Sequence, residues 1–360
     1  MTDSFLTRRA ALGLLAGTAA EAMWQGSGVA APAAGPTSEV PYGAAISSYA
    51  LQDDPAYRAA VATYCQVIVP ESEMKWDDLH RNRGEYHFEN ADRIADFARQ
   101  HHLALRGHTL AWYGAMPEWV NTISTAAEAE RELTGHIHTV VSRYRGLVSS
   151  WDVVNEPIPD KPVGVTDLRP FVWSRFLEED YIPIAFRAAA AADPKAMLVL
   201  NEYDIEYVGA RFRARRDALR HIVRRLLDRN VPLHAVGLQA HLYADRAIDR
   251  DGLQAFVSEL KGWGLKILIT ELDVIDDTLP GPEQARDAAV AAKADDFLEA
   301  VFAACRPETI ITWGLSDRYT WVPTYNKRAD GRLNRPLPLD DAMKPKPLMA
   351  VIDRYRRRAA

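Results

Sequence analysis

Short apolar runs alternate with longer segments of helical periodicity along most of the 360-residue chain. These runs are rich in Val, Ile, Leu and Ala, as expected of parallel strands that are buried on both faces. The connections between them are on the order of 20 to 50 residues, long enough for one helix each. The pattern predicts an α/β fold, a closed (β/α)₈ TIM barrel that residues 36–360 form as a single domain. Its predicted strands are 42–47, 65–70, 103–108, 151–156, 197–201, 235–241, 266–274 and 310–315.

Helices are predicted between these runs from apolar residues that recur at three- and four-residue spacing. The helix 90–101 is expected to begin at Asn90, a residue type that caps helices by accepting a hydrogen bond from a free backbone N–H. The helix 170–192 is expected to be interrupted near Pro183. The arginine-rich face of the helix 211–229 is expected to face solvent. The other predicted helices are 55–64, 125–144, 249–263, 282–304 and 346–357.

The charge balance of the chain narrows the classes of ligand. The formal net charge is −6 and no run of basic residues is longer than three, which argues against nucleic acid or an anionic membrane as a partner. No glycine-rich phosphate loop of the Rossmann or Walker type occurs, so a neutral substrate fits best. The two cysteines, Cys65 and Cys305, are too few for a metal or redox framework. We expect two separate buried thiols, with one disulfide as the alternative.

Residues 1–35 form an Ala/Pro/Gly-rich leader. The pair Arg8-Arg9 precedes a short apolar segment, as in signals of the Tat export route. That segment is too short to span a bilayer, which takes about 20 apolar residues. The leader is therefore predicted to be a Tat-like signal peptide, and the rest of the chain to reach the periplasm or the medium without membrane contact. A disordered Ala-rich segment without a targeting role is the alternative.

Two of the predicted strands end in a glutamate. The stretch 151–157 ends in Asn155, Glu156 and a proline, and the stretch 266–274 delivers Glu271. The carboxyl ends of strands are where ligands bind in α/β sheets. Either glutamate alone would more often be a helix N-terminal acid or a solvated loop residue. Two of them at strand ends of one sheet predict a pair of catalytic carboxylates.

Other strand ends carry side chains typical of sugar binding. Tryptophans stack on the apolar faces of pyranose rings, and amides, lysine and carboxylates hydrogen-bond to hydroxyls. No His-x-His motif follows the first strand and no His-Glu-x-x-His motif occurs, so we expect neither a metal nor another cofactor. Besides the two glutamates, the residues expected at the site are Glu71, Lys75, His108, Trp112, Asn155, Asn201, Tyr203, Gln239, His241, Asp273, Trp313 and Trp321.

Seven segments carry a resemblance to a known family by their content and their order. They are Glu71–Trp76, Arg106–Trp112, Trp151–Glu156, Asn201–Tyr203, Gly237–His241, Ile269–Asp273 and Thr312–Gly314. With them, the chain from about Tyr42 to Ile352 resembles the family 10 glycoside hydrolases, the endo-β-1,4-xylanases. The resemblance implies a retaining, endo-acting hydrolase of xylan and xylo-oligosaccharides that needs no cofactor.

The resemblance also implies a role for each matched residue. Glu156 matches the general acid/base, Glu271 the nucleophile and Asn155 a residue that contacts the sugar 2-hydroxyl. His241 and Asp273 match the pair that supports the nucleophile. The matched substrate-binding residues are Lys75, His108, Trp112, Gln239 and Trp313 around the sugar at the cleavage point, Glu71 one sugar further out, and Trp321 as a lid.

Departures from the family pattern bear on specificity. Ser72 stands where the family usually has Asn, and Tyr113 and Ala115 stand where it usually has His and Gln. The loop 326–341 is long and first basic, then acidic. Two other functions stay open: a related β-1,4-glucanase or mixed-specificity glycosidase, and a non-catalytic carbohydrate-binding barrel, which would be expected to lack one of the two glutamates. A monomer is expected.

Overall fold

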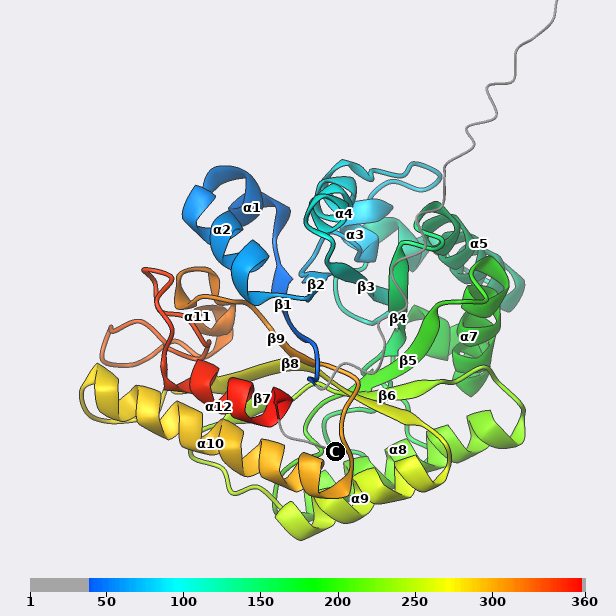
Figure 1. Cartoon of the computed structure of the whole chain (residues 1–360). Helices are drawn as coiled ribbons and strands as arrows, with labels where there is room; N and C mark the ends of the chain where they lie inside the picture. Colours follow the sequence, from blue (N-terminus) through cyan, green and yellow to red (C-terminus); the bar gives the residue numbers. More distant parts are fainter. Residues whose placement is uncertain (1–38, 358–360) are drawn as a thin grey trace, which may run out of the picture. The chain divides into compact units, whose positions relative to one another are not determined.

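The predicted parallel strands form a sheet that closes on itself, with helices around it (Figure 1). Each strand pairs with the next around the ring, β6 pairs with β8, and β9 pairs with β1 to close the barrel. The computed structural model describes residues 39–357, so the predicted leader 1–35 lies outside the described residues. The prediction of a (β/α)₈ barrel is confirmed. The ring strands are β1 (Tyr42–Ile46), β2 (Val67–Pro70), β3 (Ala104–Ala111), β4 (Val148–Asn155), β5 (Met197–Glu202), β6 (Ala235–Leu238), β8 (Lys266–Ile275) and β9 (Ile310–Thr312).

One predicted strand, 235–241, is wrong as a continuous element. β6 ends at Leu238, and Ala240 has a φ of 62°, in the left-handed region that interrupts a strand. The chain resumes as β7 (His241–Tyr243), which pairs with the outer part of β8 beyond the end of β6. The break places Gln239 and His241 on separate short segments above the barrel.

The helices lie where the apolar periodicity predicts them, with additional short ones in the loops. They are α1 (Ser48–Asp53), α2 (Pro55–Tyr64), α3 (Trp76–Leu79), α4 (Glu89–His101), α5 (Ala126–Arg143), α6 (Val172–Leu177), α7 (Tyr181–Ala192), α8 (Ala210–Asp228), α9 (Arg250–Gly262), α10 (Glu283–Ala304), α11 (Val322–Tyr325) and α12 (Pro347–Arg356), with the 3₁₀ helices η1 (Glu118–Thr122), η2 (Glu178–Asp180) and η3 (Asp317–Tyr319). No helix within residues 39–357 is long and apolar enough to cross a membrane.

Two helix boundaries differ from the prediction. α4 begins one residue before Asn90, so Asn90 lies in its first turn and is not the cap. The predicted helix 170–192 is interrupted by η2, because Glu178 has a φ of 50° and ends α6. Pro183 then occupies the first turn of α7, where its missing N–H has no helical acceptor to lose.

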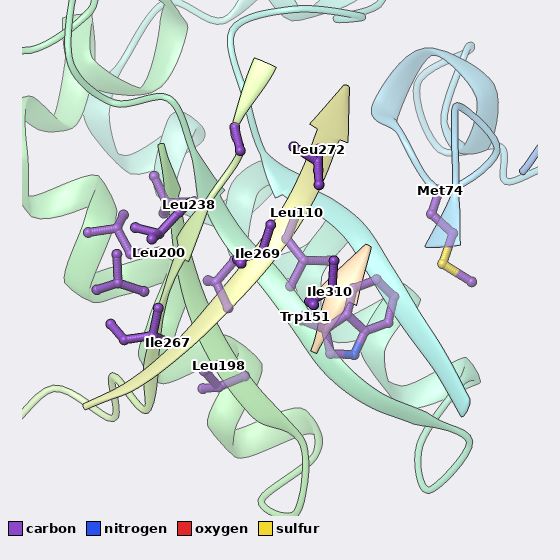
Figure 2. Close-up of a cluster of buried hydrophobic side chains, with 14 of the residues drawn as sticks. Met74, Leu110, Trp151, Leu198, Leu200, Leu238, Ile267, Ile269, Leu272 and Ile310 are labelled. Carbon is purple, nitrogen blue, oxygen red and sulfur yellow. The ribbon is translucent and has the colours of Figure 1, made fainter. Parts of the chain in front are cut away.

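The hydrophobic core lies on two faces of the barrel wall. Leu198 and Leu200 of β5 belong to the large cluster that packs against the helices, parts of which Figure 2 shows. The intervening Val199 belongs to a separate cluster with Ala235 and Leu268. Because successive strand residues point to opposite faces, this small cluster lies inside the barrel. The strands are therefore held from both sides, which fixes the positions of their carboxyl ends.

The basic face of α8 is not wholly solvated, contrary to the prediction. Arg215 and Arg216 are buried, and Arg215 donates to the carboxylate of Glu202 at the end of β5. Burial raises the pKa of Glu202 to about 7, while Arg215 opposes that rise. Each buried arginine has an acidic partner that neutralises it: Glu202 for Arg215, and Asp249, the N-cap of α9, for Arg216. The sequence of α8 alone does not reveal those partners.

The two cysteines are separate free thiols, as expected. Cys65 is buried just after α2, but Cys305 is only half-buried because it follows the last turn of α10. The prediction of two buried thiols is therefore wrong for Cys305. Burial raises the pKa of both thiols, to about 12 for Cys65 and about 11 for Cys305.

Candidate active site

β4 and β5 together position Glu156. β4 ends at Asn155, and Glu156 follows with a φ of 56°, a conformation unusual for a residue other than glycine. Its backbone N–H donates to the carbonyl of Asn201 on β5 at 2.9 Å, and Pro157 follows immediately. The strand therefore ends in a sharp turn that is held by its neighbour. Backbone strain of this kind is common at functional sites.

β8 positions the second glutamate on the far side of the ring. The backbone N–H of Glu271 donates to the carbonyl of Gln239 at 3.0 Å, and its side chain is only 4% exposed. Asp273 lies two residues further along the same strand and is fully buried. Residues two apart on a strand share a face, so both carboxylates point the same way.

Amide side chains connect the two glutamates. Asn201 Nδ2 lies 2.6 Å from Glu271 Oε1 and 2.8 Å from Asn155 Oδ1. Asn155 Nδ2 in turn donates to Glu156 Oε1 at 3.1 Å. Gln239 Nε2 donates to the same Glu156 oxygen at 3.0 Å and to Asn155 Oδ1 at 3.1 Å. One hydrogen-bonded chain of side chains therefore runs from one carboxylate to the other.

Glu271 is also held by a histidine. His241 Nε2 lies 3.1 Å from Glu271 Oε2, and its Nδ1 lies 2.9 Å from Asp273 Oδ1. Burial lowers the pKa of His241, but the charges of Asp273 and Glu271 outweigh burial and raise it well above its usual value. Burial would raise the pKa of Glu271, yet the hydrogen bond from His241 and nearby positive charge lower it. Trp321 Nε1 donates to Asp273 at 2.7 Å, so this tryptophan is hydrogen-bonded to the acid that holds His241.

Glu156 contacts aromatic residues of the loop after β3. Its Oε2 accepts a hydrogen bond from Trp112 Nε1 at 2.9 Å. The adjacent Tyr113 also interacts with this carboxylate, and burial together with the charge of Glu156 raises the pKa of Tyr113 to about 12. Gly114 packs closely beneath Trp112, where a Cβ would lie 2.6 Å from the indole ring. The aromatic pair thus forms one wall beside Glu156.

The loop after β2 and the strand β3 supply another part of the site. Lys75 Nζ lies 4.8 Å from the ring centroid of Trp112 and 5.6 Å from that of Trp313. Burial raises the pKa of Glu71 to about 7, while the charge of Lys75 opposes that rise. His108 Nδ1 lies 3.0 Å from Asp152, which fixes the orientation of its ring. These groups form a polar floor between tryptophan rings.

A cleft of about 610 Å³ brings the predicted residues together. Two of the predicted residues do not line it, and the first is Asp273, which lies behind His241. Asn201 likewise lies beneath the surface, as the bridge between the two glutamates. The predicted residues that line the cleft are Glu71, Lys75, His108, Trp112, Asn155, Glu156, Tyr203, Gln239, His241, Glu271, Trp313 and Trp321.

The structure adds cleft residues that the sequence did not single out. They come from the loops after β4, β5 and β7, from the last residues of β7 and β8, and from the helices α8 and α11, and most are charged or aromatic. The only sequence signal for them is position after a strand end, which many surface residues share. These additional residues are Asp160, Asp204, Arg211, Tyr243, Arg246, Ile275 and Tyr325.

The departures from the family pattern fall in different places. Ser72 and Tyr113 line the cleft, so both face a bound ligand. Ala115 does not line it; this residue has a φ of 48° and its carbonyl accepts the N–H of Asp77. The long loop 326–341 is fastened to the barrel by Arg328, which is buried and donates to backbone carbonyls of the β8 loop.

Among residues 39–357, no three His, Cys, Asp or Glu side chains form a group able to hold a metal ion.

Paired carboxylates at the strand ends of a (β/α)₈ barrel, in a cleft rich in aromatic and amide side chains, place this chain among the glycoside hydrolases. The sequence then identifies the family. The chain belongs to glycosyl hydrolase family 10, whose model matches residues 33–355. The family resemblance predicted from the seven segments is therefore confirmed.

Individual relatives agree with this assignment. Endo-1,4-beta-xylanase C of Phanerodontia chrysosporium is 37% identical over 276 residues, which cover 75% of this chain and 66% of that protein, slightly less than two thirds. Endo-1,4-beta-xylanase B of Paenibacillus barcinonensis is 33% identical over 322 residues, covering 84% of this chain and 92% of that protein. The crystal structure of xylanase 10B from Thermotoga petrophila in complex with xylobiose superposes with a TM-score of 0.80 at 30% identity, covering 88% and 94% of the two chains.

Proposed function

We propose that the chain is a retaining endo-1,4-β-xylanase that hydrolyses internal β-1,4-xylosidic bonds of xylan and xylo-oligosaccharides. The observation that carries this proposal is the hydrogen-bonded chain from Glu156 through Asn155 and Asn201 to Glu271. It holds two carboxylates in one cleft, each with different partners. The names of the relatives, and the xylobiose in one related structure, support xylan as the substrate class.

In the first step, Glu271 attacks the anomeric carbon while Glu156 gives its proton to the leaving oxygen. The bond to the leaving sugar breaks and a covalent glycosyl-enzyme forms on Glu271. In the second step, Glu156 takes a proton from water, and that water attacks the same carbon and releases Glu271. Two inversions at one carbon retain the β configuration.

The surroundings of the two residues fit these roles. His241 and Asn201 donate to Glu271. The hydrogen bond from His241 and nearby positive charge keep the pKa of Glu271 low, so the carboxylate is ionised and ready to attack. Glu156 is half-buried and lines the cleft, where it can exchange a proton with the leaving group and with water. No cofactor takes part in this scheme.

The direct test is hydrolysis of linear xylo-oligosaccharides followed by NMR over the first minutes. Release of β-configured products from internal bonds supports the proposal. α-Configured first products, or activity on carboxymethylcellulose that exceeds activity on xylan, would contradict it. A Glu156→Gln, Glu271→Gln double variant serves as the inactive control.

Export and a monomeric state belong to the proposal as well. The arginine pair at 8 and 9 supports export through the Tat route to the periplasm or medium. Replacing both arginines with lysine is expected to leave the protein in the cytoplasm, as fractionation would detect, and unchanged secretion would remove this route. Light scattering of the exported protein is expected to give the mass of a single chain.

A further inference from the structure

The cleft has two chemically different ends. Glu71 and Lys75, after β2, form one end, and residues after β5 and β7, on the other side of the ring, form the opposite end. Tyr203 belongs to this second end, which is joined to Glu156 because Arg169 donates to both the Tyr203 hydroxyl and the Glu156 carbonyl. Since Glu156 serves the leaving group, the second end is where the leaving sugars lie.

Two other arginines at this end are bound to groups of the protein itself. Arg169 donates to Asp160, Tyr203 and the carbonyls of Glu156 and Ile158. Arg211 donates to the Asp204 carboxylate and to the carbonyl of Asp160. These two guanidinium groups therefore act on the protein itself and hold the loops in place.

Arg246 is different. Its guanidinium lies over the ring of Tyr243, with 3.6 Å between the central carbon and the ring centroid. The side chain is 37% exposed and lines the cleft. Within residues 39–357 this guanidinium makes no side-chain hydrogen bond. Its nearest carboxylate is Asp204, at 3.8 Å, and Arg211 already binds that carboxylate.

We infer that Arg246 binds the carboxylate of a uronic-acid side group carried by the xylan chain on its leaving-group side. This inference rests on the proposed function and adds to it a substrate class, acidic decorated xylan. A planar guanidinium offers paired donors that match a carboxylate, and such charge-assisted bonds are about twice as strong as neutral ones. Stacking on Tyr243 fixes the group in advance, so little side-chain entropy is lost on binding.

The charges around Arg246 are compatible with an incoming anion. Asp204 lies between Arg211 and Arg246, so one carboxylate faces two guanidinium groups, and Asp277 acts on Tyr243 from outside this group. A neutral hydroxyl would gain only an ordinary hydrogen bond there, so the site favours an acid over a neutral sugar. The preference should also weaken with added salt because the group is partly exposed to solvent.

The test compares kcat/KM on glucuronoxylan with kcat/KM on the same polymer after its uronic acids are reduced to neutral sugars. The wild type is expected to prefer the acidic polymer by about tenfold, the size of one charge-assisted interaction. Arg246→Met is expected to bring the ratio close to one, and Arg246→Lys to keep part of the preference. Raising the salt concentration should reduce the wild-type ratio.

Arg224→Met is the matched control. Arg224 also stacks on an aromatic ring, at 4.4 Å from the centroid of Trp263, but it is exposed and does not line the cleft. The ratio of kcat/KM on the acidic polymer to kcat/KM on the reduced polymer should be the same for Arg224→Met as for the wild type. A ratio that is the same in wild type and Arg246→Met would overturn the inference while hydrolysis of linear xylo-oligosaccharides persists. Failure on linear xylo-oligosaccharides would overturn the proposed function itself.

Discussion

Glu271 and Glu156 line one cleft but lie in opposite kinds of surroundings. Glu271 is nearly inaccessible and accepts hydrogen bonds from Asn201 and His241, with a lowered pKa. Glu156 is half-buried, ends a strained turn and accepts bonds from neutral indole and amide donors. The hydrogen bond from His241 favours the ionised form of Glu271, whereas Glu156 lines the cleft and is held by neutral donors. The contrast supports the proposed roles of Glu271 as nucleophile and Glu156 as acid/base group.

The largest expected effect separates the two residues directly. Glu271→Ala removes the nucleophile, so activity should fall by several orders of magnitude on xylan and on activated aryl xylosides alike. Glu156→Ala should cost about 10²–10⁴-fold on xylan, the usual contribution of general acid–base catalysis, and far less in the first step on an aryl xyloside with a good leaving group. Pre-steady-state kinetics would show a burst for Glu156→Ala only. A normal burst from Glu271→Ala would reverse the assignment.

His241→Asn tests what keeps Glu271 ionised. Loss of the charged donor should raise the pKa of Glu271, because the hydrogen bond from His241 lowers it in the wild type. Activity requires the ionised form, so the acid limb of the kcat/KM profile should move to higher pH. The rate at the optimum should fall about 10²-fold, the scale of one lost active-site donor. An acid limb that stays in place would show that His241 does not control this ionisation.

Asn201→Ala breaks the hydrogen-bonded connection between Glu156 and Glu271. Its amide donates to Asn155 and Glu271 and accepts from the Thr270 hydroxyl, so buried groups lose their partners. Stability should fall by about 1–3 kcal/mol, the cost of unsatisfied buried polar groups, with about a tenfold loss of kcat as the two carboxylates lose their alignment. Chemical denaturation and kinetics would measure both. Asn90→Ala, at an exposed position, should change neither.

The smallest effect concerns the wall beside Glu156. Tyr113→Phe removes the phenol that interacts with the Glu156 carboxylate but keeps the ring over Arg169, whose central carbon lies 4.3 Å from the ring centroid. One exposed hydrogen bond is worth about 1 kcal/mol, so kcat/KM on xylan should change by only a few-fold. Steady-state kinetics on xylo-oligosaccharides would measure it. A loss as large as that of Glu156→Ala would mean that the phenol itself carries the proton.

The sequence was sufficient for the barrel and for most of its catalytic face. Each strand is a local apolar run, and the residue after its end is read from the same stretch, so Glu156 and Glu271 could be found before any contact was known. The break at Ala240 could not, because a left-handed residue inside an apolar run leaves the apolar pattern unchanged. The strand 235–241 was predicted as continuous for that reason.

Contacts between side chains of different strands and helices could not be predicted from the sequence. Asn201 was expected at the site, but its position between Asn155 and Glu271 follows from the pairing of β5 with β4 and β6. The burial of Arg215 follows from Glu202, which another element supplies. The position of Arg246, between the Tyr243 ring and the Asp204 carboxylate, depends on separate segments of the chain, and no single stretch of sequence contains that information.

The most direct test of the account is azide added to Glu156→Ala with an aryl β-xyloside. Azide needs no general base, so it should attack the glycosyl-enzyme on Glu271 and restore turnover. Two inversions then give β-xylosyl azide, which NMR identifies. Isolation of the α-azide, or no effect of azide on this variant, would contradict the assignment of Glu271 as nucleophile and Glu156 as acid/base.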